Sequence, residues 1–398
     1  MRLLFLACLY RKKDEDRLLG LSNGILPLTA NPLAWNLIDG LERCDYSVDI
    51  INTLPVGTYP TKFKKLFLQT QTWSHKDGSC NTEIGSINLP ILKHFIWTFR
   101  ARKFIKKWAE KSGNSTIIIM FPQQVFLSAI KDVPDNTKVV LIVPDLPQFC
   151  NPGEKKTTLT SLWISYSNKI IYRRMERVNQ FVLLTEQMKN LLPIGKKPFI
   201  VVEGIAAETP SDEGACRECK RKILLYTGTL NYVFGIKKLL QAFSAIEGAD
   251  YRLWLCGFGE ASEEITELCE SDKRVTFFGH VNKDRVHELQ SQASIMVNPR
   301  TNEGEYTKYS FPSKTMEYMA SGKPVIMYKL DGIPDEYDEY LYYVNGNSAE
   351  ALRDKIIEVC SKTPEEISEF GMRAREWVLR EKNSVVQAKK IVDMIEGV

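Results

Sequence analysis

The sequence predicts an α/β protein with two domains, each built on a doubly wound parallel sheet that helices cover on both faces. Three observations support this prediction. The chain has 398 residues, which is too long for one ordinary core and suits two. Apolar runs of strand length alternate with helical patterns in both halves. A charged, glycine-containing stretch from Glu203 to Arg221 interrupts this alternation and predicts a linker.

The first half begins with an apolar strand, and a polar segment from Tyr10 to Thr29 follows, which we expect to be a long loop. A helix is expected after Asn31 and Pro32. Further strands are predicted at 48–51, 116–121, 138–143, 181–184 and 199–202, with helices at 91–108 and 162–178. Ligands of open α/β sheets collect beyond the carboxyl ends of the strands, and Asp145 follows the strand at 138–143.

The helix at 91–108 combines apolar and basic side chains in a way that leaves two interpretations open. Leu92, Phe95, Ile96, Phe99 and Ile105 can share one face, and six lysines and arginines lie mostly elsewhere. Such a helix can pack its apolar face on the sheet as an ordinary surface helix. It can equally lie on an anionic membrane surface, which attracts basic amphipathic helices.

The second half shows a regular alternation of strands and helices. Strands are predicted at 223–226, 252–256, 275–278, 295–297, 325–328 and 341–344. Helices are expected to begin near Gly235, Gly259, Lys283, Pro312 and Ser348, and two final helices span 364–380 and 384–395. This alternation requires right-handed crossovers and a parallel sheet with helices on both faces.

The segment after the strand at 295–297 predicts an anion site. Pro312 suits the first turn of a helix, so Ser313 and Lys314 lie where unpaired backbone N–H groups and the positive end of the helix dipole gather. Glu317 projects from much the same face one turn further on. A cation and a hydroxyl beside a carboxylate suit a nucleoside diphosphate, whose phosphates need positive charge and whose ribose hydroxyls need an acceptor.

Glu317 and the residues after it, Tyr-Met-Ala-Ser-Gly-Lys-Pro-Val-Ile, resemble the second glutamate of the Glu-x7-Glu signature of retaining glycosyltransferases of the GT-B fold, in the large family 4 group. The first glutamate of that signature is replaced by Tyr309, and Ser310 to Lys314 replace the small residues that usually follow it. The resemblance implies two Rossmann-like domains facing a central cleft. It assigns acceptor binding to 1–204, nucleotide-sugar binding to 205–380, and a helix that crosses back to the first domain to 381–398.

The resemblance also assigns roles to residues of the second domain. Gly228 lets backbone amides approach the diphosphate. The family usually has an arginine and a lysine just after this glycine, whereas this sequence has Thr229, Tyr232 and Phe234. We therefore expect the positive charge to come from Arg300 and Lys314, with Ser310 and Ser313 beside them. His280 and Val281 are expected to line the base pocket, or His280 is a surface histidine in a turn.

Two residues of the first domain are candidates by resemblance. Asp145 is expected to hydrogen-bond a sugar or the attacking hydroxyl, and the alternative is a turn aspartate between two prolines. Asn31 is a candidate acceptor contact, and the alternative is a helix cap beside Pro32. We accordingly assign catalytic roles to Asp145, Arg300 and Lys314.

The composition limits the partners. A net charge of +4 is too small to indicate nucleic acid, and no apolar run is long enough to span a membrane. Nine dispersed cysteines predict free thiols in a reducing compartment, and the Cys216/Cys219 pair lacks a second pair that would suggest metal. Four histidines without a recurrent spacing also predict no metal site. We expect a cytoplasmic protein, at most peripheral at the inner face of the cell membrane.

The predicted activity is transfer of a sugar from a nucleotide donor, with UDP expected, to a hydroxyl of a glycan or polyprenyl-diphosphate-linked acceptor. The resemblance implies retention of configuration, no cofactor and no metal, in cell-surface polysaccharide synthesis of a bacterial type. Two alternatives stay open. One is a sugar-nucleotide epimerase of the same fold. The other is a binding subunit without catalysis, suggested by Tyr309 and by the missing cations after Gly228.

Overall fold

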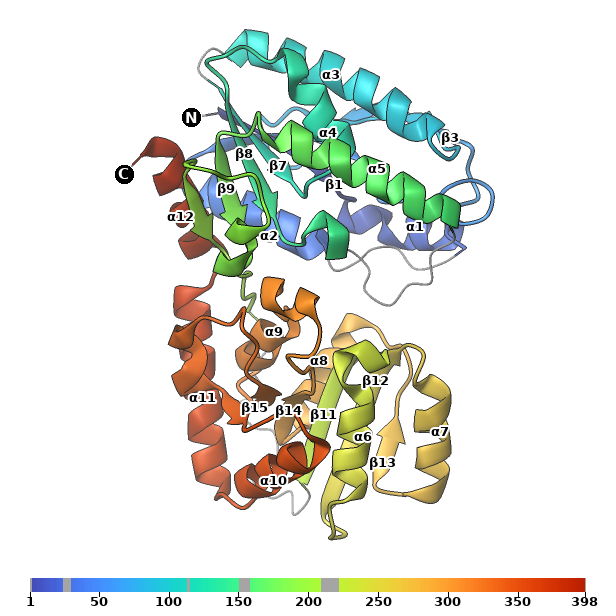
Figure 1. The fold of residues 1–398 in the computed structure, drawn as a ribbon, viewed down its shortest axis with the longest axis vertical. Helices are drawn as coiled ribbons and strands as arrows, with labels where there is room; N and C mark the ends of the chain where they lie inside the picture. The colour runs from blue at the N-terminus through green and yellow to red at the C-terminus, as the bar shows by residue number, and fades with distance from the viewer. Residues whose placement is uncertain (1, 24–29, 113–114, 150–157, 209–221, 398) are drawn as a thin grey trace. The chain divides into compact units, whose positions relative to one another are not determined.

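The computed structural model describes residues 2–23, 30–112, 115–149, 158–208 and 222–397. The chain forms two compact units (Figure 1), which are Met1–Ile205 with Ser384–Val398, and Ala206–Asn383. We call them unit 1 and unit 2. The cysteines at 216 and 219 and most of the expected linker lie outside the described residues.

Unit 1 contains an eight-stranded sheet in which every neighbouring pair is parallel except β4 with β5. The strand order is β10-β9-β8-β7-β1-β2-β5-β4. Its members are β1 (Arg2–Cys8), β2 (Ser47–Thr53), β4 (Gln71–Trp73), β5 (Asn81–Glu83), β7 (Thr116–Met120), β8 (Lys138–Val143), β9 (Gln180–Leu183) and β10 (Phe199–Val201). The predicted apolar runs became the central strands because burial on both faces requires continuous apolar sequence. A small antiparallel pair, β3 (Phe67–Leu68) with β6 (Ser86–Ile87), lies outside this sheet.

The first helices of unit 1 are α1 (Glu15–Leu21) and α2 (Ala30–Arg43), and a short 3-10 turn at Lys12–Asp14 precedes α1. The loop expected from Tyr10 to Thr29 was therefore wrong over α1, whose Leu18 is fully buried. The last helix, α12 (Ser384–Glu396), packs Ala388, Ile391 and Ile395 into the same apolar cluster as α2, so the end of the chain completes the core of unit 1.

The remaining helices of unit 1 are α3 (Leu92–Ser112), α4 (Gln124–Ala129) and α5 (Thr158–Met175), and α4 contacts both of the others (Figure 1). The face of α3 that packs inward differs from the predicted apolar face. Trp97, Ala101 and Ile105 are buried, whereas Phe95 and Phe99 are exposed. The prediction that Ile105 and Phe99 share one face of the helix was therefore wrong.

Unit 2 contains a six-stranded parallel sheet with the order β13-β12-β11-β14-β15-β16. The strands are β11 (Lys222–Thr229), β12 (Tyr251–Phe258), β13 (Val275–Phe277), β14 (Ile295–Asn298), β15 (Val325–Tyr328) and β16 (Tyr342–Val344). The chain winds outward from β11 to β13 and then returns to β14 on the other side of β11. This is the strand order of a doubly wound nucleotide-binding domain, which confirms the predicted fold class.

Helices cover both faces of the sheet of unit 2 (Figure 1). One apolar cluster joins alternate strand residues such as Leu224 and Tyr226 to α6 (Ile236–Ser244), α7 (Ser262–Ser271) and α10 (Ala349–Cys360). The opposite face receives α9 (Lys314–Ala320), against which α11 (Pro364–Glu381) packs, and α8 (Lys283–Gln292) contacts β11. The predicted helix starts near Gly235, Lys283 and Ser348 agree with these elements.

Candidate functional site

The order in which the chain adds strands to the sheet of unit 2 reverses direction between the two central strands, β11 and β14. In doubly wound sheets the carboxyl ends of such strands leave a crevice that binds ligands. In unit 2, Gly228 and Thr229 are the last residues of β11, and Pro299 and Arg300 follow β14. The fold therefore brings these residues of the two predicted segments to one edge of the sheet.

A tyrosine hydroxyl occupies the place where β11 and β14 separate. The two strands pair through Leu224 with Ile295 and Leu225 with Met296. Further along β11, the hydroxyl of Tyr318 on α9 accepts a hydrogen bond from the backbone N–H of Thr227 at 2.8 Å and donates one to its C=O at 2.9 Å. Tyr318 thus satisfies both backbone groups of Thr227 and ties α9 to the strand. The sequence pattern had indicated no role for this tyrosine.

Two glycines let the loops at this edge approach one another. A Cβ on Gly235 would lie 1.9 Å from the C=O oxygen of Pro299, and one on Gly257 would lie 1.8 Å from that of Gly228. Both glycines also have positive φ, +84° and +143°, which disfavours other residues. The last residues of β11 and β12 therefore pair without side chains between Gly228 and Gly257, and the residue before α6 packs directly on the backbone that follows β14.

Arg300 is held in place by its neighbours after β14. Its Nη2 donates to the hydroxyl of Ser310 at 2.6 Å. Its guanidinium carbon lies 4.9 Å from the ring centroid of Tyr306 and 5.8 Å from that of Phe234. Burial raises the pKa of the Tyr226 hydroxyl, and the charge of Arg300 opposes that rise. The guanidinium is therefore a fixed positive group at the carboxyl edge. The sequence predicted its charge but not the residues that hold it in place.

Lys314 and Glu317 form an ion pair on α9. The ammonium of Lys314 lies 3.0 Å from Oε1 and 2.9 Å from Oε2 of Glu317. The side chains are 38% and 32% exposed, so solvent and a ligand can reach both. Glu317 also accepts a hydrogen bond from Nε2 of Gln290 at 2.8 Å, and Gln290 on α8 is only 2% exposed. Gln290 fixes the carboxylate from the buried side, and no sequence pattern had indicated it.

A third group of residues lies where β12 ends and where the chain leaves β13. The rings of Phe258 and His280 meet edge to face at 5.6 Å between centroids, and both side chains are exposed. Burial raises the pKa of the Cys256 thiol, whereas the backbone N–H of Val281 and the charge of Lys314 lower it. Val281 follows β13, and Lys314 begins α9 on the carboxyl side of β14. The structure thus brings these predicted residues together at the same edge.

The remaining predicted residues of unit 2 lie at the ends of these elements. Thr229 is exposed at the end of β11, and its C=O accepts a hydrogen bond from Tyr226 at 2.8 Å. Ser313 precedes α9, is exposed, and makes no capping hydrogen bond to that helix. Pro312 instead accepts the first helical bond, from the N–H of Thr315 at 2.8 Å.

The two candidates of unit 1 have different environments. Asp145 is exposed in the bend after β8, at the carboxyl edge of the sheet. Asn31 is buried, accepts from the N–H of Tyr10 at 3.0 Å and donates to its C=O at 3.1 Å. Its amide therefore joins α2 to the end of β1, and it does not cap the helix. A role for Asn31 in acceptor binding stays a prediction.

Unit 1 also has a buried carboxyl group that the sequence reasoning missed. Glu83 ends β5, opposite Asn52 of β2, and is 4% exposed. It accepts a hydrogen bond from Nε2 of Gln71 at 2.7 Å. Burial raises its pKa, and the Gln71 bond and the charge of Arg11 lower it. The short strands around Glu83 carry no strong apolar pattern, which is why this position was not predicted.

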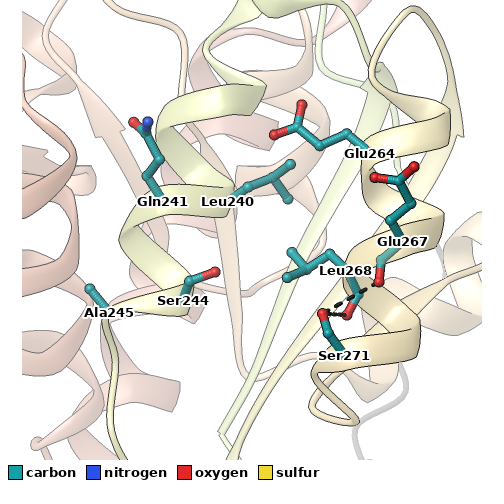
Figure 2. A pocket seen from close by; sticks show the side chains of 8 residues that line it. All are labelled: Leu240, Gln241, Ser244, Ala245, Glu264, Glu267, Leu268 and Ser271. Atoms are coloured by element: carbon teal, nitrogen blue, oxygen red, sulfur yellow. Dashed lines mark hydrogen bonds between the residues drawn. The ribbon is translucent and has the colours of Figure 1, made fainter.

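A groove between α6 and α7 is the one cavity that Figure 2 shows. Leu240 and Leu268 form its floor, and Gln241, Glu264 and Glu267 surround it. Most of its lining comes from the later turns of both helices, which lie toward the amino ends of the strands. The groove is thus separate from the carboxyl edge that carries Arg300, Lys314 and Glu317.

Within the described ranges, no three His, Cys, Asp or Glu side chains converge to hold a metal ion. None of the described helices has the length and apolarity needed to cross a bilayer.

Residues 221–362 match a family model described as Glycosyl transferases group 1. The match covers less than half of the chain and contains the whole carboxyl edge of unit 2. No curated protein sequence matches the chain.

Solved structures match the whole chain. Sucrose-phosphate synthase from Thermosynechococcus elongatus has a TM-score of 0.65 at 16% identity, covering 100% of this chain and 99% of that one. The lipopolysaccharide outer core galactosyltransferase WaaB, in its apo form, has a TM-score of 0.64 at 12% identity, with coverages of 100% and 99%. HepE from Anabaena in complex with UDP has a TM-score of 0.61 at 13% identity, with both chains covered completely. The chain therefore has the two-domain fold of GT-B glycosyltransferases, as predicted.

Proposed function

We propose that this protein is a retaining glycosyltransferase that transfers a sugar from a nucleoside-diphosphate donor to a hydroxyl group. The observation that carries the proposal is the group formed by Arg300, Lys314 and Glu317 at the carboxyl edge of unit 2, where β11 and β14 part. This edge lies inside the region that matches the glycosyltransferase family model. UDP is the proposed nucleotide, and the similar HepE structure contains UDP.

Arg300 and Lys314 are proposed to bind the diphosphate. Cleavage of the glycosyl–phosphate bond leaves negative charge on the departing diphosphate, so fixed cations stabilise the transition state. Arg300 is already oriented by Ser310 and by the rings of Tyr306 and Phe234. With two cations at this edge, the proposed reaction needs no metal ion and no other cofactor. Backbone amides near Gly228 and Thr229 and the hydroxyls of Ser310 and Ser313 complete the proposed phosphate contacts.

Glu317 is proposed to accept hydrogen bonds from the ribose hydroxyls. Lys314 forms an ion pair with this carboxylate. A bound diphosphate would compete for Lys314, and Gln290 would keep Glu317 in position after the ammonium moves. His280 and Val281 are proposed to line the base site. The exposed ring of Phe258, in contact with His280, offers an apolar surface to a base there.

Unit 1 is proposed to bind the acceptor. Asp145, at the carboxyl edge of its sheet, is proposed to hydrogen-bond the attacking hydroxyl or the donor sugar, and the departing phosphate would take the hydroxyl proton. A glycan or a polyprenyl-diphosphate-linked glycan is the proposed acceptor, in synthesis of a cell-surface polysaccharide on the cytoplasmic side of the membrane. The similar WaaB structure is that of a lipopolysaccharide outer core galactosyltransferase, and an acceptor of this class is compatible with that likeness.

The test is an assay of the purified protein with a panel of UDP- and GDP-sugars, in which released nucleotide and sugar products are both measured. Glycosyl transfer or slow donor hydrolysis supports the proposal, provided that Lys314→Ala and Arg300→Ala reduce it. Interconversion of sugar nucleotides without loss of UDP would instead identify an epimerase. Binding of UDP without turnover of any donor would identify a binding subunit.

A further inference from the structure

Large apolar side chains gather on one exposed surface of unit 1. We define the α3 surface as Phe67, Leu89, Ile91, Leu92, Phe95 and Phe99. Phe99 is 74% exposed, Phe67 68% and Phe95 65%. Phe67 lies opposite Ile87 in the β3–β6 pair, and β6 contacts α3, so only one strand separates the strand that carries Phe67 from the helix that carries Phe95 and Phe99.

This surface is exposed because α3 uses its other face for the core. Trp97, Ala101 and Ile105 are buried, and Trp97 donates to the C=O of Ile84 at 2.9 Å. Lys93 is buried on that side too, where its ammonium donates to the C=O of Val56 at 2.9 Å. These anchors fix the rotation of the helix. Phe95 and Phe99, one turn apart, must therefore point away from the core.

Basic residues continue this surface along α3. Helix α3 contains seven lysines and arginines and one acidic residue, Glu110, whose carboxylate lies 3.7 Å from the ammonium of Lys106. Lys103 and Lys106 follow Phe99 by four and seven residues, which places them on the same face of the helix. Lys62, Lys64 and Lys65, just before Phe67, are exposed. Exposed phenylalanines flanked by cations match the interface of an anionic bilayer, which offers apolar chains beneath negative headgroups.

We propose that the α3 surface docks unit 1 onto an anionic lipid bilayer, with Phe67, Phe95 and Phe99 entering the interface and the lysines contacting headgroups. A symmetric contact between two copies would bring the same basic residues together and is disfavoured by their repulsion. Phe95 and Phe99 project from the exposed face of α3, and Phe67 projects from β3. Apolar side chains that project outward in this way suit a lipid surface better than a bound peptide.

Docking here would place a particular edge of unit 1 at the membrane. The start of α3 contacts the segment after β2 through Lys93 and Val56, and that segment leaves the carboxyl edge of the sheet. Asp145 follows β8 at the same edge. A lipid-linked acceptor would then reach this edge from the bilayer without leaving it. This last step depends on the proposed function, whereas the docking itself does not.

The test is cosedimentation of the full chain with vesicles of equal parts phosphatidylglycerol and phosphatidylcholine. The wild type is expected to bind them and to bind vesicles of phosphatidylcholine alone at least about tenfold more weakly. Phe95→Ser/Phe99→Ser is expected to weaken binding about tenfold or more, because it removes the apolar groups that enter the bilayer. Lys103→Glu/Lys106→Glu is expected to weaken it by a similar factor, and added salt should abolish the difference between these charge variants and the wild type.

The matched controls are Ile357→Ser/Met372→Ser, which changes two exposed apolar side chains of unit 2, and Lys273→Glu/Lys389→Glu, which changes two exposed charges. Both should leave vesicle binding within about twofold of the wild type. All variants should keep the wild-type circular dichroism and UDP affinity. Absence of vesicle binding by the wild type, or equal loss in variants and controls, would overturn the proposal. Self-association that Phe95→Ser/Phe99→Ser abolishes, without vesicle binding, would show that a second copy covers this surface.

Discussion

Glu317 is the residue on which the nucleotide assignment depends most. Glu317→Ala removes the proposed acceptor for the ribose hydroxyls and also takes away the carboxylate that Lys314 and Gln290 contact. Loss of a hydrogen bond to a charged group costs about 1.5–3 kcal/mol, so kcat/KM is expected to fall by about one to two decades. Steady-state kinetics with the best donor measures this, and turnover close to that of the wild type would refute the assignment.

Gln290 offers a more selective experiment at the same carboxylate. Gln290→Leu keeps Glu317 charged but removes its buried donor. We expect donor KM to rise more than kcat falls, because a ribose contact acts on the bound donor as well as on the transition state. Gln290→Glu, which places a second negative group beside Glu317, should raise donor KM more than Gln290→Leu does. Equal kinetics for both variants and the wild type would show that Gln290 only fills space.

Tyr318 provides a prediction about stability. Tyr318→Phe leaves the N–H and C=O of Thr227 without the hydroxyl that now serves both. Leaving a buried polar group unpaired costs about 1–3 kcal/mol, and we expect a loss of that order in the free energy of unfolding. Urea denaturation measures it. Tyr328→Phe is the comparison, since that hydroxyl donates to a single backbone group, the C=O of Ser348 at 2.8 Å. A larger loss from the comparison variant would contradict this account.

Individual residues also show the limit of prediction from sequence. The positions of Arg300, Lys314 and Glu317 followed from the strand–loop–helix pattern, because that pattern fixes which residues reach a carboxyl edge. The roles of Tyr318 and Gln290 depend on partners 91 and 27 residues away, at Thr227 and Glu317. No local spacing encodes those contacts.

Helix α3 carries a prediction about pH. Burial, with the nearby charge of Lys93, lowers the pKa of His94 to about 4 from its usual 6.5. Between these values the unfolded chain binds the proton and the folded chain does not, so stability rises with pH. The contribution is complete above the unfolded pKa and is lost as pH falls from about 6.5 toward 4. Urea denaturation across this range should show a shallower dependence in His94→Gln, and an unchanged slope would contradict the assignment.

The elements that were predicted well are the buried strands, because continuous apolar runs bounded by polar turns have few other solutions in an α/β protein. Helix α1 was missed because its sequence is short and begins with charged residues, and the β4–β5 hairpin was missed because its strands are short, polar and at one end of the sheet. The inward face of α3 was predicted incorrectly for a specific reason. Lys93 is buried because its ammonium donates a hydrogen bond to the C=O of Val56. The face of α3 that carries Lys93 therefore packs inward, and Phe95 and Phe99 are exposed on the other face.

The whole chain is divided into two compact units. Each has its own apolar cluster, and α12 returns the end of the chain to unit 1. If UDP binds unit 2, its binding should stabilise the folded protein by mass action, by about 2.7 kcal/mol at a free concentration of one hundred times Kd. Thermal shift measures this, with UMP as the comparison that lacks the second phosphate. An equal shift from UMP and UDP would argue against the diphosphate contacts.

The central claim is that the nucleotide binds at the carboxyl edge of unit 2. A crystal structure of the protein soaked with UDP tests this claim most directly. The account predicts the diphosphate against Arg300 and Lys314, with Lys314 moved from Glu317, and the ribose hydroxyls on Glu317. The base should lie beside His280 and Val281. UDP bound in the groove between α6 and α7, or elsewhere without contact to α9, would contradict the account.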